Sequence, residues 1–109
     1  MEVRAYTKNV RMSPKKVRQV ARQIQGMEAS QARSVLKIIP RKSARLIGKT
    51  LQSAMANAEN AHNINPDGLT ISEAIVEEGR VLRRIIPCAR GSAHPLRKRS
   101  CHIRITLSE

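Results

Sequence analysis

The sequence predicts an α+β fold, in which three helices pack on a short antiparallel sheet and a long β-hairpin protrudes from the domain. Three observations support this prediction. Apolar residues recur with helical spacing in three segments between residues 14 and 62. Strand-like segments precede and follow these helices. A turn-rich centre near residue 90 separates two basic segments, and no acidic residue occurs from Gly79 to Ser108.

The first expected elements are a strand and a helix. Residues Glu2 to Asn9 alternate weakly between apolar and polar, which suits a strand. Ser13-Pro14 is a typical helix start, with Ser as the N-cap and Pro at the first helical position. Gly26 then ends the helix. Its expected buried face consists of Val17, Val20, Ala21 and Ile24.

Two further helices are expected before the next strand. One runs from about Ala29 to Ile38 and ends before Pro40, and the other runs from about Arg41 to His62, a length of about 30 Å. The predicted apolar positions of the shorter helix are Ala32, Val35, Leu36 and Ile39. Those of the longer helix are Ala44, Ile47, Leu51, Ala54, Met55 and Ala58. Small residues expected to allow close packing are Ala54, Ala56, Ala58 and Ala61.

The C-terminal part is expected to form a long hairpin. Turn residues fill positions 63–68, and a strand starts at Leu69. The apolar phase shifts near Ala74 and Val76, which indicates a β-bulge there. The strand is expected to continue through Ile86, turn at the tip, and return from about Leu96 to Leu107. The apolar positions of the returning strand are Cys101, Ile103, Ile105 and Leu107.

Length and charge limit the possible functions. The chain has 109 residues, which suits one domain spanning residues 1–109, with residues 80–99 as the hairpin arm. Net charge is +13. Residues 1–49 contain thirteen basic and two acidic residues, residues 50–79 five acidic and no basic ones, and residues 80–109 eight basic and one acidic. Such segregation predicts that one surface binds a polyanion.

Other classes of protein fit the composition less well. No apolar run reaches the roughly 18 residues of a membrane-spanning helix, and no signal peptide opens the chain. Two cysteines without a signal indicate a reducing, cytoplasmic setting. One Tyr and no Phe or Trp leave no platform for stacking bases, so phosphates and folded nucleic-acid shape are the expected targets. We expect no homo-oligomer and no cofactor.

Two groups of cations are the candidate nucleic-acid contacts. Charges without partners are costly to bury, so a basic hairpin needs a polyanion around it. The candidates in the arm are Arg80, Arg83, Arg84, Arg97, Lys98 and Arg99. Those in and before the first helix, whose N-terminus also favours phosphate, are Lys8, Arg11, Lys15, Lys16, Arg18 and Arg22.

Metal binding and catalysis find little support. Cys88, His94, Cys101 and His102 lack the close ligand pairs of ordinary zinc sites, and Cys101 is expected in the core. The chain has no nucleophile elbow, no Gly-rich phosphate loop and no H-E-x-x-H. The adjacent Glu77 and Glu78 would point to opposite faces of a strand and cannot act as a catalytic pair.

Three segments, taken in order and spacing, carry a resemblance to a known family over nearly the whole chain. They are residues 13–26, starting Ser-Pro-Lys-Lys-Val-Arg; residues 53–60, Ser-Ala-Met-Ala-Asn-Ala-Glu-Asn; and residues 78–91 followed by 98–103. In these the chain resembles the bacterial large-subunit ribosomal protein L22 family.

The resemblance implies a structural role and not an enzyme. It implies a globular domain on the outer surface of the large subunit, bound to ribosomal RNA and to neighbouring ribosomal proteins. It also implies an arm that reaches through RNA to the nascent-peptide exit tunnel, where the tip meets the nascent polypeptide. The tip residues so implied are Arg90, Gly91, Ser92, Ala93 and His94.

Some positions depart from the family's usual pattern. Gln25, Cys88 and Ser92 stand where Arg is frequent, and His94-Pro95 is unusual at the tip. The tip is therefore expected to be less basic than in typical members. Outside this family, the runner-up is a DNA-binding module, with the first two helices as a helix-turn-helix and the hairpin as a minor-groove arm. A membrane-surface protein is a third class, disfavoured by the missing Trp and Phe.

Overall fold

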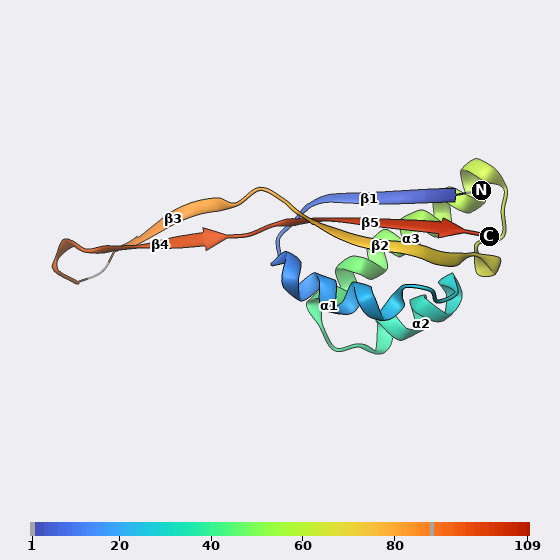
Figure 1. Cartoon of the computed structure of the whole chain (residues 1–109), viewed down its shortest axis with the longest axis horizontal. Coiled ribbons are helices and arrows are strands. Elements are labelled where there is room, and N and C mark those ends of the chain that lie inside the picture. The colour runs from blue at the N-terminus through green and yellow to red at the C-terminus, as the bar shows by residue number, and fades with distance from the viewer. Residues whose placement is uncertain (1, 88) are drawn as a thin grey trace.

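The computed structural model describes residues 2–87 and 89–109 and has the predicted α+β architecture. A globular body continues into a narrow two-stranded arm, and the long axis of the molecule measures 62 Å (Figure 1). The elements in chain order are β1 Glu2–Val10, α1 Pro14–Ile24, α2 Ala29–Ile38, α3 Lys42–His62, the 3₁₀ turn η1 Pro66–Gly68, β2 Thr70–Glu78, β3 Leu82–Pro87, the 3₁₀ turn η2 Ala89–Gly91, β4 Ala93–Lys98 and β5 Cys101–Ser108.

The body contains a three-stranded antiparallel sheet with β5 between β1 and β2. Strand β5, the last strand in chain order, is thus the central strand of the sheet. Its four predicted apolar residues alternate along the strand and are all buried, as expected for a strand with one face on the core. Pairing of Ile105 with both Ala5 and Ala74 fixes the register across the three strands.

Both outer strands contain irregularities in register. In β2 the shift lies between Ile71 and Glu73, so the bulge predicted near Ala74 falls slightly earlier in the strand. The extra residue keeps both Ile71 and Ala74 on the buried face. In β1 a second shift lies between Thr7 and Val10, where Asn9 adopts a φ of 58°. The sequence did not predict this second bulge.

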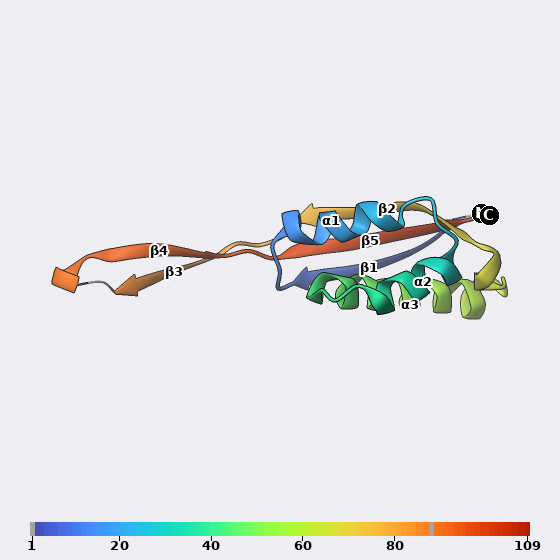
Figure 2. The same ribbon diagram turned by 90° about the horizontal axis from the view of Figure 1, so that it is seen from below.

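The helices cover the sheet and complete one core. Helix α1 packs against β2, α3 packs against β1 and β5, and α2 packs against α3 (Figure 2). Every predicted core position of α1 and of α3 is buried. In α2, Ala32 and Leu36 are buried, whereas Val35 is only half-buried. The small residues of α3 were partly misassigned: Ala54 and Ala58 are buried, but Ala56 and Ala61 are exposed.

The ends of α1 differ in part from the prediction. Ser13 occupies the N-cap position before Pro14, but its side chain makes no capping hydrogen bond. The helix ends at Ile24, and Gly26 follows with a φ of 83°. Gln25 donates from Nε2 to the carbonyl oxygen of Ala74 at 3.1 Å. This residue, the C-cap of α1, thus fastens the end of the helix to β2.

The sequence predicted a continuous hairpin, but this prediction is wrong where the arm leaves the body, because both strands are interrupted there. Strand β2 ends at Glu78 and β3 starts at Leu82, while β4 ends at Lys98 and β5 starts at Cys101. We call residues 79–81 and 99–100 the neck. Here the Gly79 amide donates to the Ser100 carbonyl at 2.9 Å, and the Ser100 hydroxyl donates to the Arg80 carbonyl.

Gly79 allows the two neck segments to approach closely. A Cβ at this position would lie 2.8 Å from the Ser100 Oγ and 3.2 Å from the Cys101 amide nitrogen. The absence of a side chain at Gly79 is therefore a requirement of the packing. This tertiary contact explains why the ladder breaks where the sequence pattern predicted a continuous strand.

Replacing Gly79 by Ala should lower the free energy of unfolding by about 1–3 kcal/mol, because the added methyl group must displace Ser100 or the backbone. Urea denaturation followed by circular dichroism measures this change. Gly68→Ala is the matched control, since a Cβ there meets nothing within 4 Å. Equal stability losses in the two variants would contradict the close-approach account.

Cys101 should be a poorly reactive thiol. It is fully buried, and burial raises the pKa of its thiol while the charge of Arg18 opposes this weakly. A raised pKa leaves less of the nucleophilic thiolate at a given pH. In a Cys88→Ser background, a chromogenic disulfide reagent at pH 8 should therefore modify Cys101 much more slowly in the folded protein than in denaturing urea. Similar rates in both conditions would show that the thiol is accessible.

Candidate nucleic-acid interface

The neck joins cations from the body and from the arm around one hollow. This hollow, of about 480 Å³, lies between the start of α1 and the base of the arm. The uncapped N-terminus of α1 lines it, which adds the positive end of the helix dipole. One acidic residue, Glu78, also lines it. The basic residues are Lys15, Arg18, Arg83, Arg97 and Arg99.

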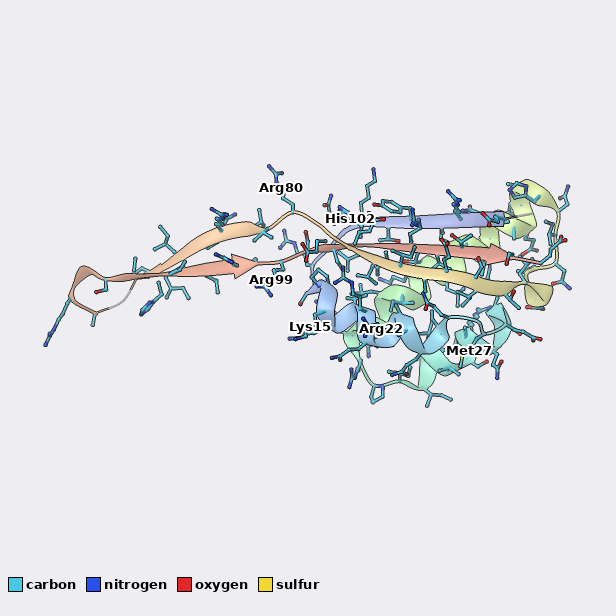
Figure 3. The ribbon with its side chains drawn as sticks, viewed as in Figure 1. Lys15, Arg22, Met27, Arg80, Arg99 and His102 are labelled. Atoms are coloured by element: carbon cyan, nitrogen blue, oxygen red, sulfur yellow. The ribbon has the colours of Figure 1, made fainter. Side chains whose placement is uncertain are left out.

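A second hollow, of about 500 Å³, lies where the end of β1 meets the neck. Its basic residues are Arg11, Arg80, Lys98 and Arg99, and no described residue that lines it is acidic. Figure 3 shows Arg80 on one side of the neck and Arg99 with Lys15 on the other. Cations therefore surround the neck and do not form a single flat patch.

None of these cations forms an ion pair with another described residue. Within residues 2–87 and 89–109, ion pairs join Arg4 to Glu2 at 3.4 Å and Arg104 to Glu77 at 3.9 Å, and neither pair involves a cation that lines the neck hollows. Arg18 is the most constrained neck cation, because its Nε donates to the Val76 carbonyl at 3.1 Å and holds α1 against β2. The others are available to external anions.

Four predicted contact residues lie outside the two neck hollows. Lys16 and Arg22 are exposed on α1, and Figure 3 shows Arg22 further along that helix than Lys15. Arg84 lies on the exposed β3, where its guanidinium donates to the Arg83 carbonyl at 2.9 Å. Lys8 lies on β1 with its Nζ 5.6 Å from the centre of the Tyr6 ring.

The surroundings of Lys8 differ in charge from the neck. The Tyr6 hydroxyl donates to Glu77 Oε2 at 3.3 Å, and desolvation together with the Glu77 charge raises the pKa of Tyr6. The Tyr6 and His102 rings lie 5.9 Å apart. A carboxylate here opposes phosphate binding, so the surroundings of Lys8 favour a phosphate less than those of the neck cations do.

The tip is a tight turn that projects its side chains outward. Arg90 and Gly91 adopt φ values of 62° and 72°, and the whole tip is exposed. Gly91 adopts this left-handed conformation without the steric cost of a side chain, which supports its expected role in the turn. Among the expected tip residues, Arg90 and His94 are the basic ones. Cys88 lies outside the described residues.

The three candidate zinc ligands that the structure describes, His94, Cys101 and His102, do not come together. Cys101 points into the core, whereas His102 accepts a hydrogen bond at Nδ1 from the Asn9 amide at 3.1 Å. His94 lies at the far end of the arm, in β4. In the part of the chain that the structure describes, no three potential metal ligands come together. None of the helices described there has the length and apolar character to cross a lipid bilayer.

Sequence reasoning missed a third basic hollow, which lies between α2 and α3 and has a volume of about 870 Å³. We call it the α2–α3 groove. The signal available in the sequence was a run of six cations with no acidic residue between Glu28 and Glu59. Its basic residues are Arg33, Lys37, Arg41, Lys42, Arg45 and Lys49.

Comparison with known proteins connects this architecture to one family. Residues 5–108 match the family model described as ribosomal protein L22p/L17e. Similar proteins include three named large ribosomal subunit protein uL22. That of Opitutus terrae is 56% identical over 109 residues, covering 100% of this chain and 96% of the relative. The Methylacidiphilum infernorum protein is 53% identical with the same coverage.

The third relative, from Akkermansia muciniphila, is 48% identical over 109 residues and is covered to 97% of its length. These matches extend along both the globular body and the arm. They confirm the resemblance carried by the three sequence segments. The chain belongs to the ribosomal protein L22p/L17e family.

Proposed function

We propose that this chain is a structural protein of the large ribosomal subunit, located in the cytoplasm within the ribosome, that binds and organises large-subunit ribosomal RNA during assembly. The tip of its arm then lines the nascent-peptide exit tunnel. The observation that carries this proposal is an arm whose basic and apolar side chains are both exposed. Family membership supports the ribosomal role, and the RNA contacts rest on the arguments that follow.

The arm has the surface of a segment that a partner must cover. Strands β3 and β4 pair with each other in a separate two-stranded sheet, so each leaves one edge not covered by another strand. Ile85 is 72% exposed and Val81 43% exposed, beside Arg83 and Arg97. Exposed strand edges and apolar groups favour association. The adjacent cations select a polyanionic partner, and folded RNA supplies both phosphates and a wall around the arm.

The neck cations fit the same partner. They come from the segment between β1 and α1, from α1, from β3 and β4, and from the neck itself, and they surround the base of the arm. An RNA strand that passes the neck would meet phosphate ligands on either side. We propose the RNA-binding residues to be those predicted from the sequence, with the strongest contribution from Arg11, Lys15, Arg80, Arg83, Arg97, Lys98 and Arg99.

The tip is proposed to have a different environment from the rest of the arm, residues 82–87 and 95–99, which we call the shaft. Residues 90–94 contain one Arg and one His, whereas the shaft contains five Lys or Arg residues. A less basic tip suits an aqueous tunnel better than contact with phosphates. Family membership supports the ribosomal role over the DNA-binding alternative. No feature of the described residues favours DNA binding.

In the free protein the arm should exchange its amide hydrogens quickly while the helices remain protected. A two-stranded hairpin is marginally stable in water, and repulsion between its cations weakens it further. Hydrogen exchange measured by mass spectrometry should show low protection for Leu82–Pro87 and Ala93–Lys98, and high protection for α3. Comparable protection of arm and helices would contradict the need for a partner.

Neutralising the shaft and deleting the tip should have different consequences. Replacing Arg83, Arg84, Arg97, Lys98 and Arg99 together by Gln should strongly impair incorporation into large subunits, because up to five phosphate contacts are lost. Deleting residues 90–94 should leave incorporation nearly intact and alter tunnel-dependent behaviour such as peptide stalling. The measurement is the occupancy of each variant in purified large subunits.

Circular dichroism of each variant provides the control, since the helices of the body should be unaffected. The proposed division between shaft and tip is wrong if the tip deletion is excluded from subunits as strongly as the shaft variant. The RNA-binding role itself is wrong if both variants are incorporated as well as the unaltered chain.

A further inference from the structure

His102 is a half-buried polar side chain where the arm joins the body (Figure 3). It follows Cys101, the first residue of β5, whose side chain is buried in the core. Because successive side chains of a strand point to opposite faces, His102 lies on the face of the sheet away from the helices. There it contacts residues of β1 and of the neck.

The bulge in β1 presents a backbone amide to this side chain. Between its last two pairs with β5, strand β1 has two residues, Lys8 and Asn9, where β5 has the single residue His102. An extra residue of this kind interrupts the ladder of backbone hydrogen bonds. The Asn9 amide donates instead to Nδ1 of His102 at 3.1 Å. A side-chain nitrogen thus replaces a backbone acceptor at this point of the sheet.

This hydrogen bond determines where the ring holds its proton. A ring nitrogen that accepts a hydrogen bond has no proton of its own, so the neutral His102 ring is protonated at Nε2. The ring is also packed on two sides. Its centre lies 5.9 Å from that of the Tyr6 ring, whose hydroxyl donates to Glu77, and its Cε1 lies 3.2 Å from where a Cβ of Gly79 would be. These contacts hold Nδ1 in place at the Asn9 amide.

Asn9 has a backbone conformation that needs such support. Its φ of 58° lies in the left-handed region, which residues other than glycine seldom adopt, although Asn does so more readily than most. Conformations of this kind persist where neighbouring contacts hold them. The hydrogen bond from the Asn9 amide to His102 is one such contact, and it comes from the central strand of the sheet.

The conformation of Asn9 bears on the second neck hollow. Asn9 and Arg11 both line this hollow, together with the cations of the neck. After Asn9 the chain turns, with the Met12 amide donating to the Val10 carbonyl at 2.9 Å, and α1 starts at Pro14. The bulge therefore sets the direction in which the chain leaves β1, and with it the place of Arg11 in the wall of the hollow.

We propose that His102 is a positioning residue for RNA binding. Its neutral ring, protonated at Nε2, holds Asn9 in the bulge and thereby keeps Arg11 beside the cations of the neck. The inference rests on the proposed function, since the anion at this hollow is taken to be ribosomal RNA. His102 itself needs no contact with the RNA. Without the acceptor, Arg11 would lie on a looser segment, and ordering that segment on binding would lower the affinity.

Two variants separate the acceptor from the ring. His102→Asn keeps an acceptor bonded to Cγ, as Nδ1 is, but lacks the ring, whereas His102→Phe keeps a ring beside Tyr6 but has no acceptor. Hydrogen exchange measured by NMR should show similar rates for the Asn9 amide in the unaltered chain and in His102→Asn, and a several-fold faster rate in His102→Phe. The Gly26 amide, which donates to the Ile71 carbonyl at 2.9 Å, is the internal reference and should not change.

Binding of each full chain to large-subunit ribosomal RNA transcribed in vitro tests the role in recognition. His102→Phe should weaken the affinity by about 3- to 10-fold, the effect of losing one hydrogen bond, and His102→Asn should weaken it by less than about twofold. In an Arg11→Gln background the effect of His102→Phe should largely disappear, because the side chain that the ring positions is gone. A ring with a purely structural role would give the same loss in both backgrounds.

Nitrogen-15 NMR of the unaltered chain reports the protonation of the ring at neutral pH. The His102 signals are those missing from the spectrum of His102→Asn, and they should show a proton on Nε2 and none on Nδ1. A proton on Nδ1 overturns the inference and leaves the proposed function standing. Equal RNA affinities of the Asn and Phe variants, or an undiminished effect in the Arg11→Gln background, also overturn it alone. No RNA binding by the unaltered chain would overturn the proposed function, and the inference with it.

Discussion

The chain has a net charge of +13. Among the described residues, only Arg4 and Arg104 lie within ion-pair distance of a carboxylate. This unrelieved repulsion shapes the rest of the structure. Among the described residues, the buried ones are mostly small or branched apolar residues, and the Cys101 thiol is the one ionisable group that is buried with them. The cations are placed at the surface, around the neck, along the arm and in the α2–α3 groove. The fold thus separates a self-sufficient core from surfaces that an external polyanion stabilises.

Strand β5 connects these two parts. Its buried residues hold the centre of the sheet between β1 and β2, and the same segment of chain continues toward the tip as β4. At the neck, the close contact between Gly79 and Ser100 joins arm and body. Arg80 and Arg99 flank this contact on different sides of the neck, next to Arg11 and to the cations of α1 (Figure 3). The packing at Gly79 therefore contributes to the arrangement of the basic surface at the neck.

The sequence predicted the helices well because burial follows a period that a single segment displays. The apolar spacing in α1 and α3 located their ends to within a residue or two and gave their buried positions correctly. The break in the hairpin was not predictable in this way, since it depends on a contact between residues 79 and 100. The bulge at Asn9 and the α2–α3 groove likewise involve contacts between residues that are far apart in the sequence. The groove cations lie on two helices, and only the packing of α2 against α3 brings them together.

The most direct test of the central claim compares side-chain accessibility of the arm in the free protein and in purified large subunits. Hydroxyl-radical labelling read by mass spectrometry reports it for Ile85 and Leu96, which are 72% and 36% exposed in the structure. Leu51 is fully buried and serves as the internal reference. The account predicts that Ile85 and Leu96 are labelled in the free protein and protected in the subunit, while Leu51 stays unlabelled in both. Equal labelling of Ile85 and Leu96 in both states would show that no partner covers the arm.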